Sequence, residues 1–305
     1  MTPFTVSVVI PSYKRHKEVI RAVRSVLAQT LPPVEVIVSN DGHDPEKKEL
    51  LQTIEDNRVR YVEAPRKGNA SATRNFGIQR ANGNWVALLD DDDVWLPDKL
   101  KSQFEQFEKS GRDEAILGGV ERVYLKNGKI KYRPKAVHSN EVTSADLLFS
   151  ETGSIHTSTI IAPAKVFRKH PFNEKLDRHE DWEWLLEAGE CMPVVLTNHV
   201  VCERWILPGE GLSRQGGFDY AWSWYQRNHH RIHAANRTRF VCTILARKAS
   251  YDHKFSAIPV LLIELRDNGS LKLFHCWRLA VHWGKGIRII RGFKNSLDTN
   301  QLNDA

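Results

Sequence analysis

Short apolar runs and stretches with helical spacing alternate along the first hundred residues. The apolar runs predict β-strands at residues 5–10, 34–39, 59–63 and 85–89. Apolar residues that recur every three or four positions predict helices at residues 16–29, 45–54 and 69–81. This alternation is typical of a mostly parallel sheet with helices on both faces. Ligands of such sheets bind beyond the carboxyl ends of the strands, so we expect a binding site there.

The pattern changes after residue 114. Two β-rich runs, at 120–125 and 129–133, flank Asn127-Gly128 and predict a hairpin with a type I′ turn. Further elements are predicted at 144–149 (helix), 158–161 (strand), 180–188 (helix) and 194–205 (strand). From residue 218 onward the spacing is mostly helical. We therefore divide the chain into residues 1–217 and an extension over residues 218–305.

Composition and cysteine usage narrow the class of protein. Hydrophobic residues make up 41% of the 305 residues and charged residues 27%, which is typical of a globular protein. The apolar run Val6–Ile10 is too short for a signal peptide, and no run approaches the roughly 20 apolar residues of a transmembrane helix. The four cysteines form no CxxC pair, which disfavours zinc or a disulfide framework and fits a reducing cytoplasm.

Four consecutive carboxylates, Asp90 to Asp93, follow the apolar run at residues 85–89. Their mutual repulsion destabilises the fold unless a cation compensates it. Oxygen ligands suit hard cations such as Mg²⁺ or Mn²⁺. The alternative is a solvated acidic turn ahead of a helix that begins near Pro97. The position at a strand end favours the metal site.

The other predicted strands also end in polar or cationic residues. The first is followed by Pro11-Ser12-Tyr13-Lys14-Arg15, which offers an aromatic ring and a cation. The second leads to Asp41, whose carboxylate can accept a hydrogen bond from a base N–H. The third leads to Gly68, where a ligand can approach a helix N-terminus, and to Arg74, which can pair with a phosphate or with the acidic run.

These segments, taken in order, resemble the successive motifs of family 2 glycosyltransferases. The motifs are VVIPSY at residues 8–13, SNDG at 39–42, ATRNFG at 72–77 and LDDDD at 89–93. The resemblance covers about residues 6–213. It implies the α/β GT-A fold, a Rossmann-like mixed sheet with helices on both faces, followed here by a C-terminal helical extension. A dinucleotide-binding protein would instead carry GxGxxG after its first strand.

The resemblance also implies that residues 1–114 form the nucleotide-sugar-binding half, and it implies roles for residues within that half. The implied donor-binding residues are Pro11, Ser12, Tyr13, Arg15, Asp41, Gly68, Arg74, Asp90 and Asp91. In the family's Asp-x-Asp signature, Asp90 faces the ribose and Asp92 binds the Mn²⁺ or Mg²⁺ that bridges the diphosphate. Because all four positions are aspartate, Asp91 and Asp93 remain alternative participants.

Residues 115–217 form the implied acceptor-binding half. Arg178–Trp184 resembles the family's Glu-Asp motif, whose aspartate is the general base of inverting members, so Asp181 receives that role. The alternative for Glu180 and Asp181 is acidic decoration of a helix N-terminus. Glu180, Trp182 and His156 are acceptor-side candidates, with a core tryptophan and a structural histidine as alternatives. Arg204–Arg214 resembles a loop that closes on the donor diphosphate.

The formal net charge of +7 is concentrated in the extension. Residues 219–295 hold 14 lysines and arginines against 4 acidic residues, whereas residues 1–218 are close to neutral. Along residues 271–291, basic residues and an apolar stripe recur at helical spacing. This pattern predicts an amphipathic helix on an anionic membrane surface, and the alternative is a helix that packs on the catalytic region.

We therefore expect an inverting, metal-dependent glycosyltransferase of bacterial surface polysaccharide or lipopolysaccharide assembly. It would move a hexose from a UDP-sugar to a hydroxyl of a lipid-linked saccharide, in the cytoplasm or at the inner face of the membrane. A sugar-nucleotide nucleotidyltransferase is the alternative, and it would carry a glycine-rich loop after the first strand. A nucleic-acid-binding protein is disfavoured because the motifs lie in the near-neutral region. The sugar, the acceptor, the linkage and the oligomeric state stay open.

Overall fold

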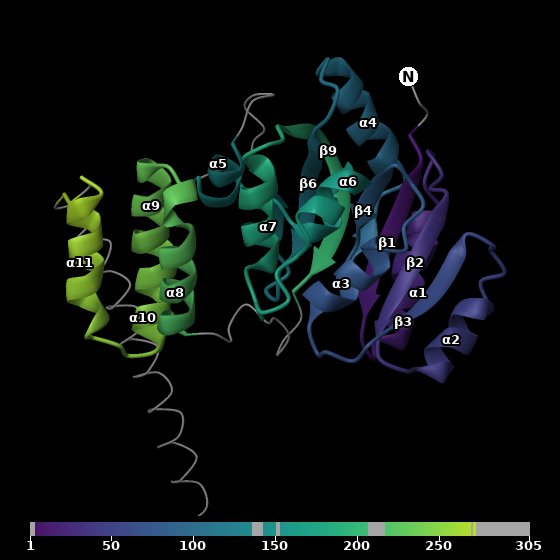
Figure 1. Ribbon diagram of the computed structural model, residues 1–305, viewed down its shortest axis with the longest axis horizontal. Helices are drawn as coiled ribbons and strands as arrows, with labels where there is room; N and C mark the ends of the chain where they lie inside the picture. Colours follow the sequence, from purple (N-terminus) through teal and green to yellow (C-terminus); the bar gives the residue numbers. More distant parts are fainter. Residues whose placement is uncertain (1–3, 136–142, 151–152, 207–216, 270, 273–305) are drawn as a thin grey trace, which may run out of the picture. The chain divides into compact units, whose positions relative to one another are not determined.

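The computed structural model describes residues 4–135, 143–150, 153–206, 217–269 and 271–272. The chain divides into two compact units, Met1–Gly211 and Leu212–Ala305. Within the described residues, the first unit holds one β-sheet with helices, and the second unit is helical (Figure 1).

Four parallel strands form one half of the sheet, in the order β3-β2-β1-β4. Their bounds are β1 (Val6–Ser12), β2 (Glu35–Asp41), β3 (Val59–Ala64) and β4 (Trp85–Leu88). Every residue of β1 and β2 is buried, which explains why both contain near-continuous apolar runs. Because the four strands are parallel, their carboxyl ends meet at one edge of the sheet, as the sequence predicts.

Helices cover both faces of these strands. The first four are α1 (His16–Leu27), α2 (Pro45–Gln52), α3 (Ala70–Ile78) and α4 (Lys99–Lys109). Val8 of β1 belongs to the same core cluster as Val19 of α1 and Phe104 of α4. Val9, which points to the opposite face, belongs to a second cluster with Ile78 of α3. The alternation of side chains along β1 thus builds a core on each face of the sheet.

The other half of the sheet is mixed. Its strands are β5 (Val94–Trp95), β6 (Ile116–Tyr124), β7 (Ile130–Arg133), β8 (Ile161–Pro163) and β9 (Val194–Trp205). Strand β8 is antiparallel to both β4 and β6, and β6 is parallel to β9. Three more helices belong to this half: α5 (Ser144–Phe149), α6 (Ala164–Lys169) and α7 (Glu180–Gly189). This arrangement gives a single mixed sheet in the described part of the first unit.

Two local predictions are wrong in detail. The strand predicted at residues 158–161 begins at Ile161, because Thr157–Thr159 forms a 3₁₀ turn, in which the side chain of His156 accepts the Ser158 amide. The hairpin between β6 and β7 is present, but its turn is not type I′. Gly128 has a φ of +74° while Asn127 does not have a positive φ, so the loop is a type I turn followed by a left-handed glycine.

The described part of the second unit is a group of helices around an aromatic core. The helices are α8 (Phe218–Asn228), α9 (Ala234–Phe240), α10 (Ala246–Tyr251) and α11 (Ala257–Asp267), with a π-helical turn at Val241–Leu245. Trp224, Tyr225 and Phe240 are buried, and the ring centroid of Phe240 lies 5.7 Å from that of Trp224 and 5.2 Å from that of Tyr225. Most of the predicted amphipathic helix, the part beyond residue 272, lies outside the described residues.

Among the described helices, none combines the length and the apolar character that crossing a bilayer requires.

Gly77 sets the distance between α3 and the sheet. A Cβ at this position would lie 2.7 Å from Val9 Cγ1 and 3.2 Å from Ser39 Cβ. We predict that Gly77→Ala lowers the free energy of unfolding by about 1–3 kcal/mol, because the added methyl overpacks this contact. Urea denaturation checks this, with the exposed Gln79→Ala as the control. An unchanged unfolding midpoint for Gly77→Ala would contradict the close packing.

Candidate active site

The acidic run after β4 turns sharply, so its four carboxylates point in different directions. The Asp93 amide donates to the Asp90 carbonyl at 3.1 Å and closes this turn. Asp91 and Asp93 are buried, whereas the Asp92 side chain is 40% exposed. The run therefore supplies two separate groups of side chains rather than one cluster.

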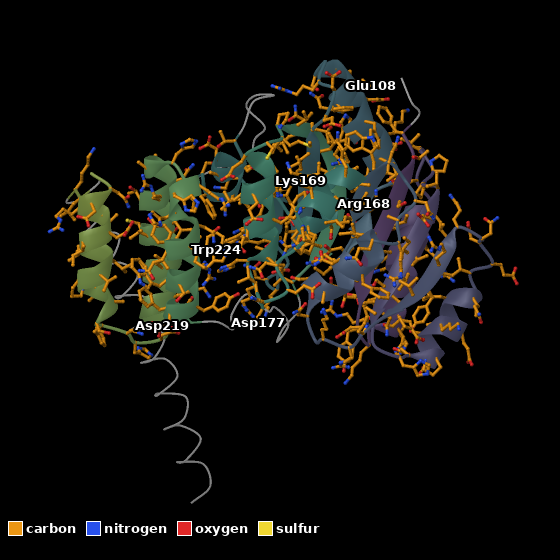
Figure 2. The ribbon with its side chains drawn as sticks, viewed as in Figure 1. Glu108, Arg168, Lys169, Asp177, Asp219 and Trp224 are labelled. Carbon is orange, nitrogen blue, oxygen red and sulfur yellow. The ribbon has the colours of Figure 1, made fainter. Side chains whose placement is uncertain are left out.

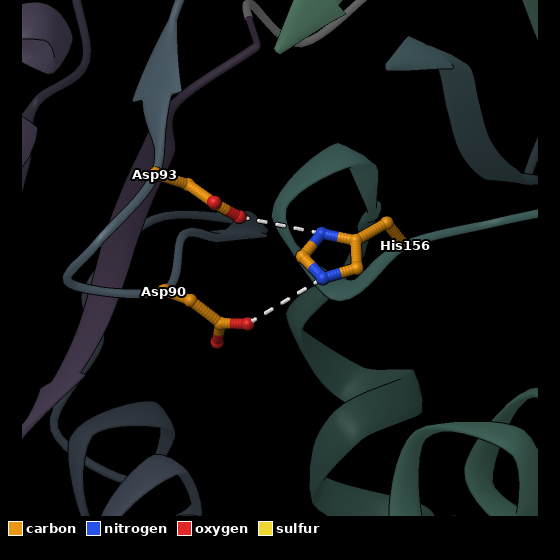
Figure 3. Close-up of side chains that lie close together, drawn as sticks. All are labelled: Asp90, Asp93 and His156. Atoms are coloured by element: carbon orange, nitrogen blue, oxygen red, sulfur yellow. Dashed lines mark ion pairs between the residues drawn. The ribbon is translucent and has the colours of Figure 1, made fainter. Parts of the chain in front are cut away.

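The first group is Asp90 and Asp93 together with His156, which precedes the 3₁₀ turn (Figure 3). His156 Nδ1 lies 3.3 Å from Asp93 Oδ2, and His156 Nε2 lies 3.9 Å from Asp90 Oδ2. One ligand atom from each residue falls within 4.8 Å of the other two. The remaining oxygen of Asp93, Oδ1, is buried and has no hydrogen-bond partner among the described residues.

The protonation of these three residues suits a divalent cation. Burial raises the pKa of Asp93 well above its usual value, and the charges of Asp90 and Asp92 raise it further. A bound cation would reverse this by favouring the carboxylate. Burial lowers the pKa of His156, with Arg204 acting in the same direction, so the imidazole is kept neutral and able to bind a metal. An imidazole and two carboxylates, one of which has an unpartnered buried oxygen, thus fit a divalent cation.

The second group links Asp91 and Asp92 to the segment after β1. Ser12 Oγ donates to Asp91 Oδ2 at 2.8 Å, and Arg15 Nη1 donates to Asp91 Oδ1 at 2.9 Å. The same Arg15 nitrogen lies 2.6 Å from Asp92 Oδ2. Burial raises the pKa of Asp91 to about 6, and Arg15 and Ser12 oppose that rise. Asp92, to which the sequence assigns the metal, is not among the three converging ligands, and its role as a ligand stays a prediction.

The remaining donor-side candidates line the same edge of the sheet. Asp41 ends β2, and its carboxylate accepts the backbone amides of Lys67 and Gly68 at 2.9 and 3.0 Å. It thereby holds the loop in which Gly68 takes a φ of +75° ahead of α3. Pro11 lies near the end of β1, and the exposed Tyr13 ring follows it.

Arg66 is a cation near this edge that the sequence did not single out. Its guanidinium lies 4.0 Å from the centroid of the Tyr13 ring, and its Nε lies 3.7 Å from Asp41 Oδ2. Arg66 follows β3, and only the folded loop brings it to residues that follow β1 and β2.

Arg74 joins the acidic run to α7. The buried guanidinium donates through Nη2 to Asp90 Oδ1 at 2.8 Å and through Nη1 to Glu180 Oε1 at 2.9 Å. Burial opposes ionisation of Asp90, but the charge of Arg74 outweighs it and lowers the pKa of that carboxyl. Arg74 comes from α3 and Glu180 is the first residue of α7, so this bridge fixes the two halves of the site to each other.

Asp181 lies in the first turn of α7, next to Glu180. Its Oδ1 accepts the Trp182 amide at 2.9 Å. Burial raises the pKa of Asp181 to about 7, and the neighbouring charge of Glu180 adds to the rise. A carboxylate with a pKa near neutrality can take a proton from a hydroxyl at physiological pH.

Trp182 packs within the protein on at least one face. Its ring stacks on His179, with centroids 4.3 Å apart, and meets Phe149 edge-on at 5.4 Å. His179 has a φ of +59° and is the N-cap residue that precedes α7. Contact between Trp182 and an acceptor stays a prediction.

The sequence did not predict a second feature, a buried ion pair close to the candidate metal site. Glu121 of β6 accepts from Arg204 Nε at 2.9 Å and from Arg204 Nη2 at 3.2 Å. The signal was a glutamate within an apolar strand. Arg204 begins the segment expected to close on the donor, and residues 207–214 of that segment lie outside the described residues.

Residues 7–175, which include the strand ends and the acidic run, match the family model described as glycosyl transferase family 2. The chain belongs to this family. Asp181 lies just beyond the matched residues, and His156 lies within them.

The curated relatives of this family 2 protein include other glycosyltransferases. An uncharacterized glycosyltransferase of Rickettsia conorii is 31% identical over 193 residues, which are 62% of this chain and 32% of the relative. The amylovoran biosynthesis glycosyltransferase AmsB of Erwinia amylovora is 28% identical over 198 residues, 62% of this chain and 65% of AmsB. The chain spans about a third of the length of the first curated relatives that it matches.

The crystal structure of residues 1–349 of S. aureus TarS in complex with UDP-GlcNAc superposes with a TM-score of 0.63 at 15% identity. The match covers 94% of this chain and 92% of TarS 1–349. Together with the family match, this confirms the GT-A fold that the motifs of the sequence imply.

The geometry predicts which residues bind a metal. Asp93→Asn and His156→Ala should each weaken Mn²⁺ binding to the purified protein by at least about tenfold, because each removes one ligand. Electron paramagnetic resonance of free Mn²⁺ measures this without any donor. Asp92→Asn separates the two assignments: the affinity should change by less than about twofold if Asp92 only pairs with Arg15, and fall by at least about tenfold if Asp92 is a ligand. A loss confined to Asp92→Asn would move the metal to that residue.

Proposed function

We propose that this protein is an inverting glycosyltransferase that moves a hexose from a UDP-sugar to a hydroxyl of a saccharide. The observation that carries the proposal is the bridge of Arg74 between Asp90 and Glu180, at 2.8 and 2.9 Å. This bridge supports Asp181, a carboxylate with a pKa near 7, at the same edge as the candidate cation ligands. A base and a diphosphate-binding site side by side are what this reaction requires.

The names of relatives support the substrate classes. AmsB is named for amylovoran biosynthesis and ExoO of Rhizobium meliloti, 35% identical over 111 residues, for succinoglycan biosynthesis. TarS has been crystallised with UDP and with UDP-GlcNAc. We extend these observations to a UDP-sugar donor and a lipid-linked saccharide acceptor in bacterial surface polysaccharide assembly.

The two halves of residues 1–217 would divide the substrates between them. Pro11, Tyr13, Arg15 and Asp41 would hold the nucleotide at the strand ends, with the backbone at Gly68 approaching the base. The half formed by residues 115–217 would bind the acceptor, with His156, Glu180 and Trp182 on that side. In the extension, the basic residues 271–291 would bring the enzyme to the anionic inner face of the membrane.

Asp181 would act as the general base. Its carboxylate takes the proton from the acceptor hydroxyl as that oxygen bonds to the anomeric carbon, and the bond from this carbon to the phosphate oxygen breaks, which releases UDP. Such proton transfer contributes about 10²–10⁴-fold to the rate. Displacement from the opposite face needs no enzyme nucleophile. The Glu180–Arg74 pair orients the first turn of α7.

Asp90, Asp93 and His156 would hold a divalent cation. Such a cation supplies charge stabilisation to the leaving diphosphate. The protein's own contribution is to fix the two carboxylates. Arg74 donates a hydrogen bond to Asp90, and Ser158 Oγ donates to Asp93 Oδ2 at 2.6 Å.

The general base is tested by Asp181→Asn. We expect the transfer rate to fall at least about 10²-fold, because an amide cannot accept the proton, while UDP affinity stays within twofold. Asp177→Asn is the control, since Asp177 is an exposed aspartate four residues upstream (Figure 2). Full turnover by Asp181→Asn would reject the residue as the base.

The raised pKa of Asp181 predicts the pH profile of kcat. Only the ionised carboxylate accepts a proton, so kcat should rise tenfold per pH unit at low pH and level off above about 7. Initial rates at saturating substrates between pH 5 and 9 measure this limb. A limb with its midpoint near 4 would show that the carboxyl keeps its ordinary pKa.

A further inference from the structure

Lys47 is a fully buried lysine beneath the proposed donor edge. Its side chain has no exposed surface, and it reaches from α2 toward the ends of two strands. Nζ donates to Ser12 Oγ at 2.8 Å and to Asn40 Oδ1 at 2.6 Å, and it lies 3.7 Å from Asp44 Oδ2. Burying an ammonium is costly unless its donors are paired, so this lysine is held by specific partners.

The contact with Lys47 decides which way the Ser12 hydroxyl points. An ammonium carries three donors and no acceptor, so Ser12 Oγ must accept from Lys47. The proton of the hydroxyl is then directed elsewhere, and Asp91 Oδ2 lies 2.8 Å from Ser12 Oγ. Lys47 therefore makes Ser12 a donor to Asp91.

From Asp91 the same network reaches the exposed side of the donor edge. Arg15 donates to the other oxygen of Asp91 at 2.9 Å and lies 2.6 Å from Asp92. Ser12 ends β1, Asn40 lies near the end of β2, and Asp91 follows β4. One ammonium thus ties together three adjacent strand ends at the edge where ligands of such sheets bind.

We propose that Lys47 is a positioning residue for the nucleotide-sugar donor, which it orders through the Ser12 hydroxyl without touching the donor. This rests on the proposed function, because the donor must bind at these strand ends. Ser12, Asp91 and Arg15 are held in one arrangement before the nucleotide-sugar binds. Binding therefore does not have to supply the free energy of ordering them. Loss of Lys47 weakens donor binding and leaves the proton transfer at Asp181 unchanged.

The test compares Lys47→Met with Lys48→Met, the adjacent but exposed lysine of the same helix. UDP is titrated calorimetrically in the presence of Mn²⁺. We expect Kd to rise about tenfold for Lys47→Met, the size of a lost hydrogen bond to a charged group, and to stay within twofold for Lys48→Met. The KM for the UDP-sugar should rise with kcat unchanged. An unchanged Kd and KM would overturn the role of Lys47, and a wild type that does not bind UDP would overturn the proposed function as well.

A double-mutant cycle with Ser12→Ala separates positioning from a general structural effect. Because Lys47 acts through Ser12, Lys47→Met should change Kd by less than twofold in the Ser12→Ala background. Fully additive losses would overturn the proposal. If Lys47→Met does not fold, Lys47→Gln replaces it in the same cycle, since the glutamine amide keeps N–H donors while the charge is removed.

Discussion

The active-site region depends on one buried guanidinium. Arg74 donates to Asp90, which follows β4, and to Glu180, which begins α7, so it connects residues that are 90 positions apart in the chain. Without it, two carboxylates would face each other in a buried space with no compensating charge, which is strongly destabilising. With it, the end of β4 and the first turn of α7 keep one relative arrangement. The candidate base Asp181 is held near the candidate cation ligands for this reason.

The rest of the acidic run is organised by similar compensation. Lys47 and Arg15 offset the charge around Asp91, and Arg74 offsets that of Asp90. Asp93 has no cationic side chain in direct hydrogen-bond contact among the described residues, and burial raises its pKa. Burial therefore favours the neutral acid at Asp93, and its ionised form would have no compensating charge beside the neutral imidazole. A divalent cation at this point would favour the carboxylate form of Asp93 and complete the charge balance.

The positions of the strands were predictable from the sequence because buried parallel strands have near-continuous apolar runs. The site was predictable at their carboxyl ends because the polar motifs follow these runs directly in the sequence. The direction of each carboxylate was not predictable. It depends on the turn that Asp93 closes on Asp90, and on a 3₁₀ turn that brings His156 from 63 residues away. Lys47 and the Glu121–Arg204 pair were missed because a lysine in a charged helix or a lone glutamate in a strand reveals no partner before the chain folds.

The proposed function requires this edge of the sheet to bind a nucleoside diphosphate through carboxylates bridged by a cation. Calorimetric titration of UDP into the full chain, with Mn²⁺ and then with a chelator, tests it most directly. We expect saturable binding with Mn²⁺ and a loss of affinity of at least about tenfold with the chelator, because carboxylates and phosphates repel each other without a bridging charge. Equal affinity under both conditions would contradict a cation-bridged site.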